Sequence, residues 1–105
     1  MDYEAIRHRF LPMTESCFYI LLSLQQPRHG YGILQHVRTL TQGRLLLGAG
    51  TLYQTLGKLE AVGLIQSAGQ SERKKYYDIT PAGRRLLREE AYRIAELYHN
   101  SAALR

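Results

Sequence analysis

The side chains best suited to chemistry in this sequence gather in one stretch, GAGTLYQTLGKLEAVGLI, at residues 48–65. Leu52, Leu56 and Leu59 are four and three residues apart, so they form one apolar face of a helix. The opposite side has a row of hydrogen-bonding residues with no acidic member: Thr51, Gln54, Thr55 and Lys58. Glutamine can pair with adenine, threonine can reach a phosphate or a thymine methyl group, and lysine adds a positive charge. The pattern is typical of a helix that holds an anion, although a solvated helix face would carry the same residues.

A second group of charged residues, Arg73, Lys74 and Lys75, follows the turn that we expect at AGQSE (68–72), between two alternating runs. A charge run on its own is usually solvated. A basic hairpin soon after a polar, acid-free helix face is a joint feature, and nucleic-acid binding explains both with one surface. The 14 Lys and Arg against nine Asp and Glu give a net charge of +5 and a pI near 9.6. Such a balance suits a polyanion or an acidic membrane surface.

Enzymatic, metal and membrane functions find little support in the sequence. G-x-S-x-G, Walker and zinc-ligand spacings are absent, and His29 and His36 have no Cys or carboxylate at ligand spacing. Cys17 is the single cysteine and lies in an apolar pattern, so we expect a core residue and a reducing cytoplasm. The apolar run at 17–24 is too short to span a bilayer, and the charged start of the chain does not resemble a signal peptide. We therefore expect a chain that is not an enzyme, with no cofactor, no metal and no membrane association.

The candidate residues must be positioned by a series of short elements. The periodicity and the Gly and Pro positions predict a helix at 2–10, a helix from Thr14 to Pro27 and a turn at RHGYG (28–32). A helix at 33–40 closed by Gly43, an extended piece at 44–47 and a helix at 48–62 follow. A hairpin then leads to a last helix from Thr80-Pro81 to about Asn100. This order predicts a mainly α fold with a small β-hairpin: a winged helix-turn-helix with an added N-terminal helix and a long C-terminal helix. In that fold the third core helix enters the major groove of DNA.

The last helix carries an apolar seam of its own. Its members repeat at intervals of four, three and four: Leu87, Ala91, Ile94 and Tyr98. A core this small offers the seam no evident partner, and an exposed apolar stripe would promote aggregation. We expect it to pair with a second copy of the chain, with Tyr3, Ile6 and Phe10 covering part of the same surface. At 105 residues we expect one compact domain, in which 1–80 bind DNA and 81–105 form the dimer.

Three segments together resemble the PadR family of bacterial transcriptional regulators: HGYGI, GTLYQTLGKLEAVGLI and RKKYYDITPAGRRLL. The similarity runs over roughly residues 14–90, and the combination of G-T-L-Y, L-E-x-x-G-L-I and K-Y-Y-x-I-T-x-x-G is specific. The resemblance implies a homodimeric repressor that binds an inverted-repeat operator through the recognition helix 48–62 and the basic wing 69–76. By position it implies DNA contacts from Thr51, Tyr53, Gln54, Lys58, Arg73, Lys74 and Lys75.

The chain departs from the family in two places. Gly48 stands where members often carry Ser or Asn, so the side-chain cap of the recognition helix is missing. The single C-terminal helix resembles a short subgroup, some members of which bind planar aromatic effectors between the subunits, in part through tryptophan. This chain has no Trp, so Tyr92 and Tyr98 are its candidates to stack an effector, although interface packing explains them as well. The main rival function is a protein-interaction module that uses the same fold without DNA.

Overall fold

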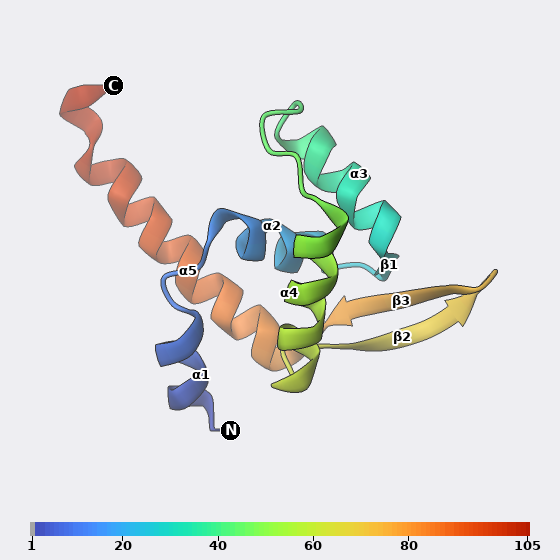
Figure 1. Cartoon of the computed structure of the whole chain (residues 1–105). Coiled ribbons are helices and arrows are strands. Elements are labelled where there is room, and N and C mark those ends of the chain that lie inside the picture. The colour runs from blue at the N-terminus through green and yellow to red at the C-terminus, as the bar shows by residue number, and fades with distance from the viewer. Residues whose placement is uncertain (1) are drawn as a thin grey trace.

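The architecture follows the predicted order of helices and adds one strand. The computed structural model describes residues 2–105 (Figure 1). The elements are α1 (Tyr3–Phe10), α2 (Glu15–Ser23), β1 (Arg28–His29), α3 (Gly30–Leu40), α4 (Ala49–Ala61), β2 (Ile65–Ser71), β3 (Lys74–Ile79), α5 (Pro81–Asn100) and a short 3-10 helix, Ala102–Leu104. The strands form one antiparallel sheet in the order β1-β3-β2. Across residues 2–105, the structure has no helix with the length and apolar character that crossing a membrane requires.

Local capping fixes where most of the helices start. Each of four helices begins at a side chain that accepts a hydrogen bond from the backbone N–H three residues on: Asp2 for α1, Thr14 for α2, His29 for α3 and Thr80 for α5. Pro81 occupies the first turn of α5, as predicted. Gly48 precedes α4 and has no side chain to offer, which confirms the expected missing cap.

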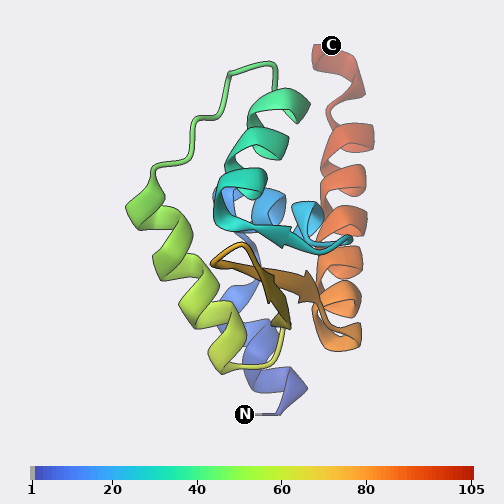
Figure 2. The same ribbon diagram turned by 90° about the vertical axis from the view of Figure 1, so that its right-hand side faces the viewer.

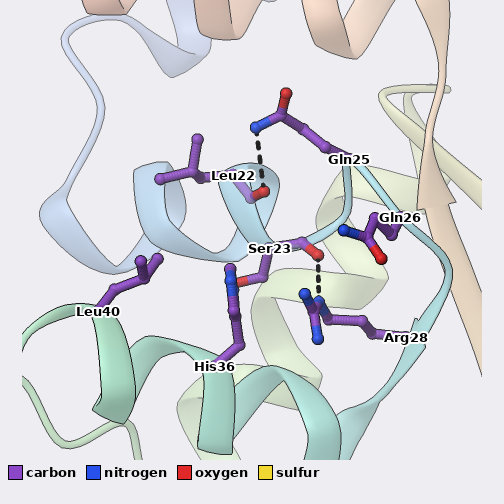
Figure 3. A pocket seen from close by; sticks show the side chains of 7 residues that line it. All are labelled: Leu22, Ser23, Gln25, Gln26, Arg28, His36 and Leu40. Atoms are coloured by element: carbon purple, nitrogen blue, oxygen red, sulfur yellow. Dashed lines mark hydrogen bonds between the residues drawn. The ribbon is translucent and has the colours of Figure 1, made fainter.

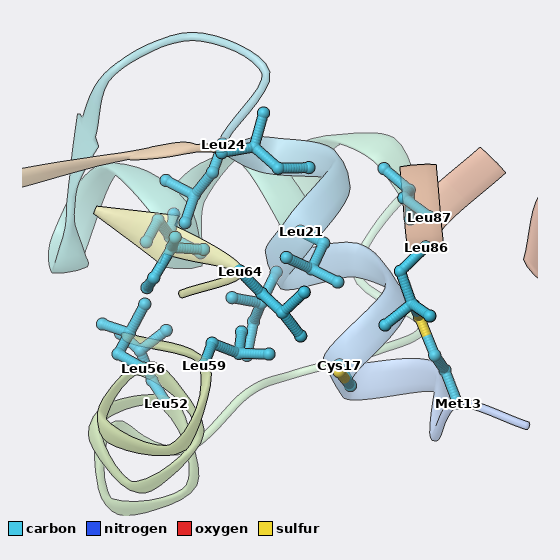
Figure 4. Packing of buried hydrophobic residues seen from close by; sticks show 14 of the residues in the cluster. Met13, Cys17, Leu21, Leu24, Leu52, Leu56, Leu59, Leu64, Leu86 and Leu87 are labelled. Atoms are coloured by element: carbon cyan, nitrogen blue, oxygen red, sulfur yellow. The ribbon is translucent and has the colours of Figure 1, made fainter. Parts of the chain in front are cut away.

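The core is built from the apolar faces of all the larger helices (Figure 4). Leu52, Leu56 and Leu59 of α4 are at most 1% exposed, and they pack with the apolar residues of α2 and α3. Leu86 and Leu87 of α5 join the same cluster. The first half of α5 therefore packs into the same core as the helices before residue 80.

The prediction of a turn at RHGYG (28–32) is wrong. Arg28 and His29 form β1, which pairs with β3 so that His29 lies opposite Tyr76, and Gly30 is already helical. The two glycines are a local turn signal, whereas the partner strand lies far along the chain, so the local pattern could not reveal the pairing. The RLLL segment (44–47) belongs to the irregular connection between α3 and α4 rather than to the sheet.

The hairpin turn is also displaced from its expected position at 68–72. Ser71 pairs with Lys74, which makes Glu72 and Arg73 the two turn residues, with φ angles of 52° and 64°. A two-residue turn of this kind usually contains Asn-Gly, because both residues have positive φ. Here the glycine, Gly69, has a φ of 101° and lies where the strand register shifts between Ser67 and Gln70. The glycine therefore marks a bulge in β2 and not the tip of the wing.

Candidate nucleic-acid interface

Helix α4 forms one edge of the molecule. In Figure 1 it stands in front, between α1 on its left and the β2–β3 hairpin on its right, and Figure 2 shows it on the side of the molecule opposite α5. Its three buried leucines hold it to the core, so the face opposite them is turned away from the chain. This arrangement leaves the predicted recognition helix accessible along its length.

The outermost face of α4 carries very small residues around one amide. Gly50, Gln54, Gly57 and Ala61 follow one another at intervals of four, three and four, so they share one stripe opposite the leucines. A Cβ added at Gly50 or Gly57 would meet no described atom of residues 2–105 within 4 Å. Glycine inside a helix costs about 0.5–1 kcal/mol relative to alanine. Packing within the chain does not explain either glycine, and neither was among the predicted site residues.

The predicted row of polar residues lies together on one flank of α4, whereas Tyr53 lies on the other. Thr51, Thr55 and Lys58 lie toward α1 and line an open groove there, while Gln54 extends from the outermost stripe to the edge of that groove. Tyr53 lies on the other flank, is 58% exposed, and places its hydroxyl beside Gly30 at the start of α3. The site is thus a ridge, with the predicted row along one flank and Tyr53 on the other.

The three basic residues of the hairpin differ in their surroundings. Arg73 occupies the tip and Lys74 the first position of β3, and both are exposed. The Lys75 ammonium lies 3.7 Å from the Glu60 carboxylate and 5.0 Å from the centroid of the Tyr77 ring. An exposed ion pair of this kind contributes about 0–1 kcal/mol. All three basic residues border a hollow between the hairpin and the Tyr53 flank of α4, so positive charge stands beside that flank.

The two histidines considered as metal ligands have other roles. His29 caps α3 through Nδ1, which accepts from the Gly32 N–H at 3.1 Å. His36 lies in a separate pocket at the ends of α2 and α3 (Figure 3), where its Nδ1 is 2.9 Å from the Ser23 hydroxyl. That hydroxyl donates to the Tyr19 carbonyl, so His36 is the donor of the pair. Burial and the nearby Arg28 guanidinium lower the pKa of His36. Among residues 2–105, no three His, Cys, Asp or Glu side chains gather as metal ligands.

The predicted dimer residues separate into two groups. Ile6 and Leu87 are 4% and 6% exposed and belong to the core of the chain itself, and Tyr3 and Phe10 are half-buried against it. The apolar spacing was read correctly, but at these positions the partner is the chain's own core, so they have little surface left for a second copy. Ala91, Ile94 and Tyr98 are exposed, and residues 91–100 are all exposed. Leu97, which is 53% exposed, lies three residues after Ile94 and was not part of the predicted seam.

The two tyrosines proposed to stack an effector do not face each other on one helix. Tyr92 and Tyr98 are six residues apart, which places them about 120° apart around the axis of α5. The guanidinium of Arg105 lies 3.6 Å from the centroid of the Tyr98 ring and covers one of its faces. Tyr92 is 71% exposed. The geometry thus gives no shared slot within one chain for the two rings.

A different aromatic pocket lies between α2 and α5. Phe18, Tyr19 and Ile94 line it, with the Glu90 carboxylate at one side. Glu90 is 1% exposed; its Oε2 accepts from the Met13 N–H at 2.8 Å, and the Arg93 guanidinium donates to both carboxylate oxygens. The bonds from Arg93 and Met13 hold the pKa of Glu90 below its ordinary value despite burial. The ion pair within α5 thus fixes the Glu90 carboxylate, whose hydrogen bond from Met13 joins α5 to the segment just before α2.

Comparison with known proteins identifies the family. Residues 20–89, more than half of the chain, match the "Transcriptional regulator PadR-like family". The chain is 39% identical over 71 residues to an uncharacterised 37.1 kDa protein in a transposon of Streptomyces fradiae. That match covers 68% of this chain and 20% of the relative, so the chain spans about a fifth of the relative's length.

The fold is shared with solved regulators. A PadR family transcriptional regulator from Eggerthella lenta superposes with a TM-score of 0.69 at 27% identity, covering 96% of this chain and 86% of that one. One from Clostridium difficile gives 0.71 at 22% identity, covering 84% and 95%. Both the predicted fold class and the predicted family are confirmed: the chain belongs to the PadR-like family of transcriptional regulators, with a DNA-binding winged-helix fold.

Proposed function

We propose that this chain is a homodimeric repressor that binds an inverted-repeat operator in double-stranded DNA, with α4 in the major groove. The observation that carries the proposal is the outermost face of α4, where Gln54 stands between two glycines that the packing of the chain does not require. Small residues let the helix backbone approach base edges closely. The Gln54 amide can then donate and accept in the pattern that adenine presents.

The flanks of α4 supply the phosphate contacts in this proposal. Lys58 and the Thr51 and Thr55 hydroxyls serve one side, and Tyr53 with the basic hairpin residues serves the other. Arg73 and Lys74 are exposed at the tip of the wing, where a charged side chain can follow a phosphate strand. Lys75 contributes less, because part of its charge is already offset by Glu60.

A second copy of the chain covers the exposed stripe of α5 in the proposed dimer. Ile94, Leu97 and Tyr98 are 40%, 53% and 57% exposed on a half-helix that extends away from the core. A helix segment this short is marginal in water without tertiary contacts. Pairing with the same segment of a partner would bury the stripe and set the spacing of two recognition helices, which an inverted repeat requires.

We also propose that a flat aromatic effector releases the DNA, and that it binds at the α2–α5 pocket beside the dimer stripe. Phe18 and Tyr19 give aromatic surface there, and Ile94 belongs both to the pocket and to the stripe. A ligand at this place would shift α5 against α2, because the pocket is lined by residues of both helices. Tyr98 of the partner is the remaining candidate to close the pocket, whereas Tyr92 lies on a different face of the helix.

DNA affinity measured against salt tests the function and separates it from the rival protein-interaction module. Duplexes selected by the purified protein from a random library would be compared with a scrambled duplex at several KCl concentrations. We expect tighter binding to the selected duplex and a steep loss of affinity with salt, because phosphate contacts release counterions. Failure to select any duplex, or equal affinity for both at all salt concentrations, would contradict the proposal.

The effector has its own test. Planar dyes would be titrated into the protein and into its complex with the selected duplex, with tyrosine fluorescence and DNA release as the two readouts. We expect both signals to change together, and Phe18→Ala to weaken them. Dyes that release DNA equally from the Phe18→Ala variant would place the effector elsewhere.

A further inference from the structure

The groove between α1 and α4 has the chemistry of a phosphate site. It encloses about 450 Å³, and it lies between the end of α1, the start of α2 and one flank of α4. Arg9 and Lys58 bring two positive charges to it, and Thr14, Ser16, Thr51 and Thr55 bring hydroxyl groups. None of the described residues that line it carries a carboxylate. Burial raises the pKa of the Cys17 thiol at its base to about 11, so the thiol adds no negative charge at neutral pH.

The position of the groove relative to α4 suggests what fills it. The residues that line the groove place it on the α1 flank of α4. The hairpin lies on the other flank of that helix (Figures 1 and 2). The major groove of B-DNA is about 12 Å wide, and an α-helix with its side chains is about 10–12 Å across. A helix seated there therefore meets a phosphate strand on each side. The wing can reach only one of the two strands, so the other strand runs along the α1 flank.

The two arginines near the end of α1 have different partners. The Arg7 guanidinium is committed within the chain: its Nε lies 2.8 Å from the Glu89 carboxylate and its second nitrogen 3.1 Å from Glu4. With Ile6 buried in the core, this pair holds α1 against α5. Arg9 is exposed, borders the groove, and has its guanidinium carbon 5.2 Å from the centroid of the Phe10 ring. Contact with a ring leaves the N–H donors of an arginine available to a phosphate.

We propose that Arg9, together with Lys58 and the Thr14 and Thr51 hydroxyls, binds phosphates of the DNA strand on the side of α4 away from the wing. The N-terminal helix is then part of the DNA interface and not only a cover for the core. This inference rests on the proposed DNA binding and adds a third contact region to it. Arg9 reads no bases, so its contribution is the same for every sequence.

The test compares Arg9→Gln with Arg88→Gln, which removes the same charge from an exposed position of α5. The helix α5 lies on the side of the molecule opposite α4 (Figure 2). Affinity for the selected and the scrambled duplex would be measured at several KCl concentrations. For Arg9→Gln we expect weaker binding to both duplexes by a similar factor, and a salt slope lower by about one. Arg88→Gln should keep the wild-type slope. Circular dichroism and thermal unfolding check that both variants fold.

Phosphate ethylation interference adds a readout that reports position. Wild-type protein should show interference at phosphates on both sides of each half-site. Arg9→Gln should lose those on one side, and Lys74→Gln those on the other. A wild-type slope for Arg9→Gln, or loss of the same phosphates as in Lys74→Gln, overturns the inference while DNA binding itself stands. A wild-type protein with no salt-dependent binding to any duplex overturns the proposed function and this inference together.

Discussion

The hydroxyl of Tyr53 lies against the backbone of Gly30, at the place where α3 begins beside the hairpin. A Cβ at Gly30 would stand 2.5 Å from the Tyr53 oxygen and 3.0 Å from the ring carbon that bears it. Gly30 therefore keeps the ring of Tyr53 between α3 and the basic wing. Since the ring is largely exposed and can swing away, we expect Gly30→Ala to fold, at a cost of about 1 kcal/mol, the low end for overpacking. Its DNA affinity should fall because Tyr53 is displaced.

A double-variant comparison isolates this relationship. Tyr53→Ala, Gly30→Ala and the combined variant would be titrated with the same duplex, and their unfolding by urea compared. Gly30→Ala should lose about as much affinity as Tyr53→Ala, and the combination should lose little more than either, because both remove one ring from one place. Losses that simply add would show that Gly30 acts on DNA binding independently of Tyr53.

The buried Glu90 carboxylate makes stability depend on acid. Bonds from the Arg93 guanidinium outweigh the effect of burial, and the Met13 N–H adds to them, so the pKa of Glu90 is lowered from its ordinary 4.5. A carboxylate whose pKa is lower in the folded state than in the unfolded state stabilises the fold fully at pH values above its unfolded-state pKa. This stabilisation is lost as the pH falls through the folded-state pKa. We therefore expect wild-type stability to drop below about pH 4.5, where Glu90→Gln, which has no carboxylate to protonate, should change less.

Urea unfolding from pH 7 to pH 3 measures this difference. Glu90→Gln should be less stable at pH 7 by about 1–3 kcal/mol, because an amide offers one acceptor oxygen in place of two. The gap should narrow below pH 4.5. Glu96→Gln, on the exposed half of α5, is the control and should follow the wild type throughout. Measurements belong at one protein concentration, because a dimer unfolds in a concentration-dependent way. A gap of constant size across the range would contradict the assignment to Glu90.

The two open glycines of α4 should separate stability from function. Gly50→Ala and Gly57→Ala place a methyl group in open space, so each should stabilise the fold by about 0.5–1 kcal/mol. Each should also weaken DNA binding, because the methyl group stands on the face that approaches the bases. Gly43, which has a φ of 80°, is a useful contrast: alanine there should destabilise the fold. Alanine at both α4 positions with undiminished DNA affinity would show that this face stays clear of the DNA.

Local signals in the sequence predicted those parts of the fold that local physics determines. Thr14 and Thr80-Pro81 start helices wherever they occur in a suitable pattern, and both do so here. The buried face of α4 could be predicted from the spacing of its leucines, because that spacing matches the repeat of a helix. The seam on α5 shows the limit of such spacing. Leu87 and Ile94 share a stripe, but only the packed structure shows that Leu87 is buried in the core and that Ile94 is 40% exposed.

Contacts between distant segments account for what the sequence did not reveal. β1 exists because β3 offers an unpaired edge to Arg28 and His29. Arg9 is a candidate for phosphate binding only because α1 lies beside α4. No residue pattern within 2–10 indicates that α4 is the neighbour of this helix. The importance of Gly50 and Gly57 also depends on knowing that open space surrounds them, since a glycine in a sequence is by default turn punctuation.

The exposed stripe of α5 should make the chain a dimer. Ile94→Asp would place a charge in the proposed apolar interface, and we expect it to convert a dimer to a monomer in light scattering and sedimentation. Tyr92→Asp, on a face of α5 about 120° away from Tyr98, is the matched control and should remain dimeric. A wild-type protein that is monomeric at micromolar concentration, or a Tyr92→Asp variant as monomeric as Ile94→Asp, would rule out the proposed interface.

The ridge of α4 and the wing should differ in the kind of binding energy that they contribute. Gln54 stands on the outermost stripe and can pair with a base, so Gln54→Ala should cost about 1–3 kcal/mol on the selected duplex and relax the choice at one position. Lys74, at the first position of β3 beside the tip of the hairpin, should hold a phosphate whatever the sequence. Lys74→Ala should therefore weaken all duplexes alike and lower the salt slope by about one.

Binding of each variant to selected and scrambled duplexes over a range of KCl distinguishes the two effects. Lys75→Ala is an internal comparison, because its ammonium is already paired with Glu60 at 3.7 Å; its change in salt slope should be smaller than that of Lys74→Ala. A repeat of the library selection with Gln54→Ala would locate the relaxed position within the half-site. Should Gln54→Ala weaken both duplexes equally while Lys74→Ala changes the selected sequence, the roles of the ridge and the wing would have to be exchanged.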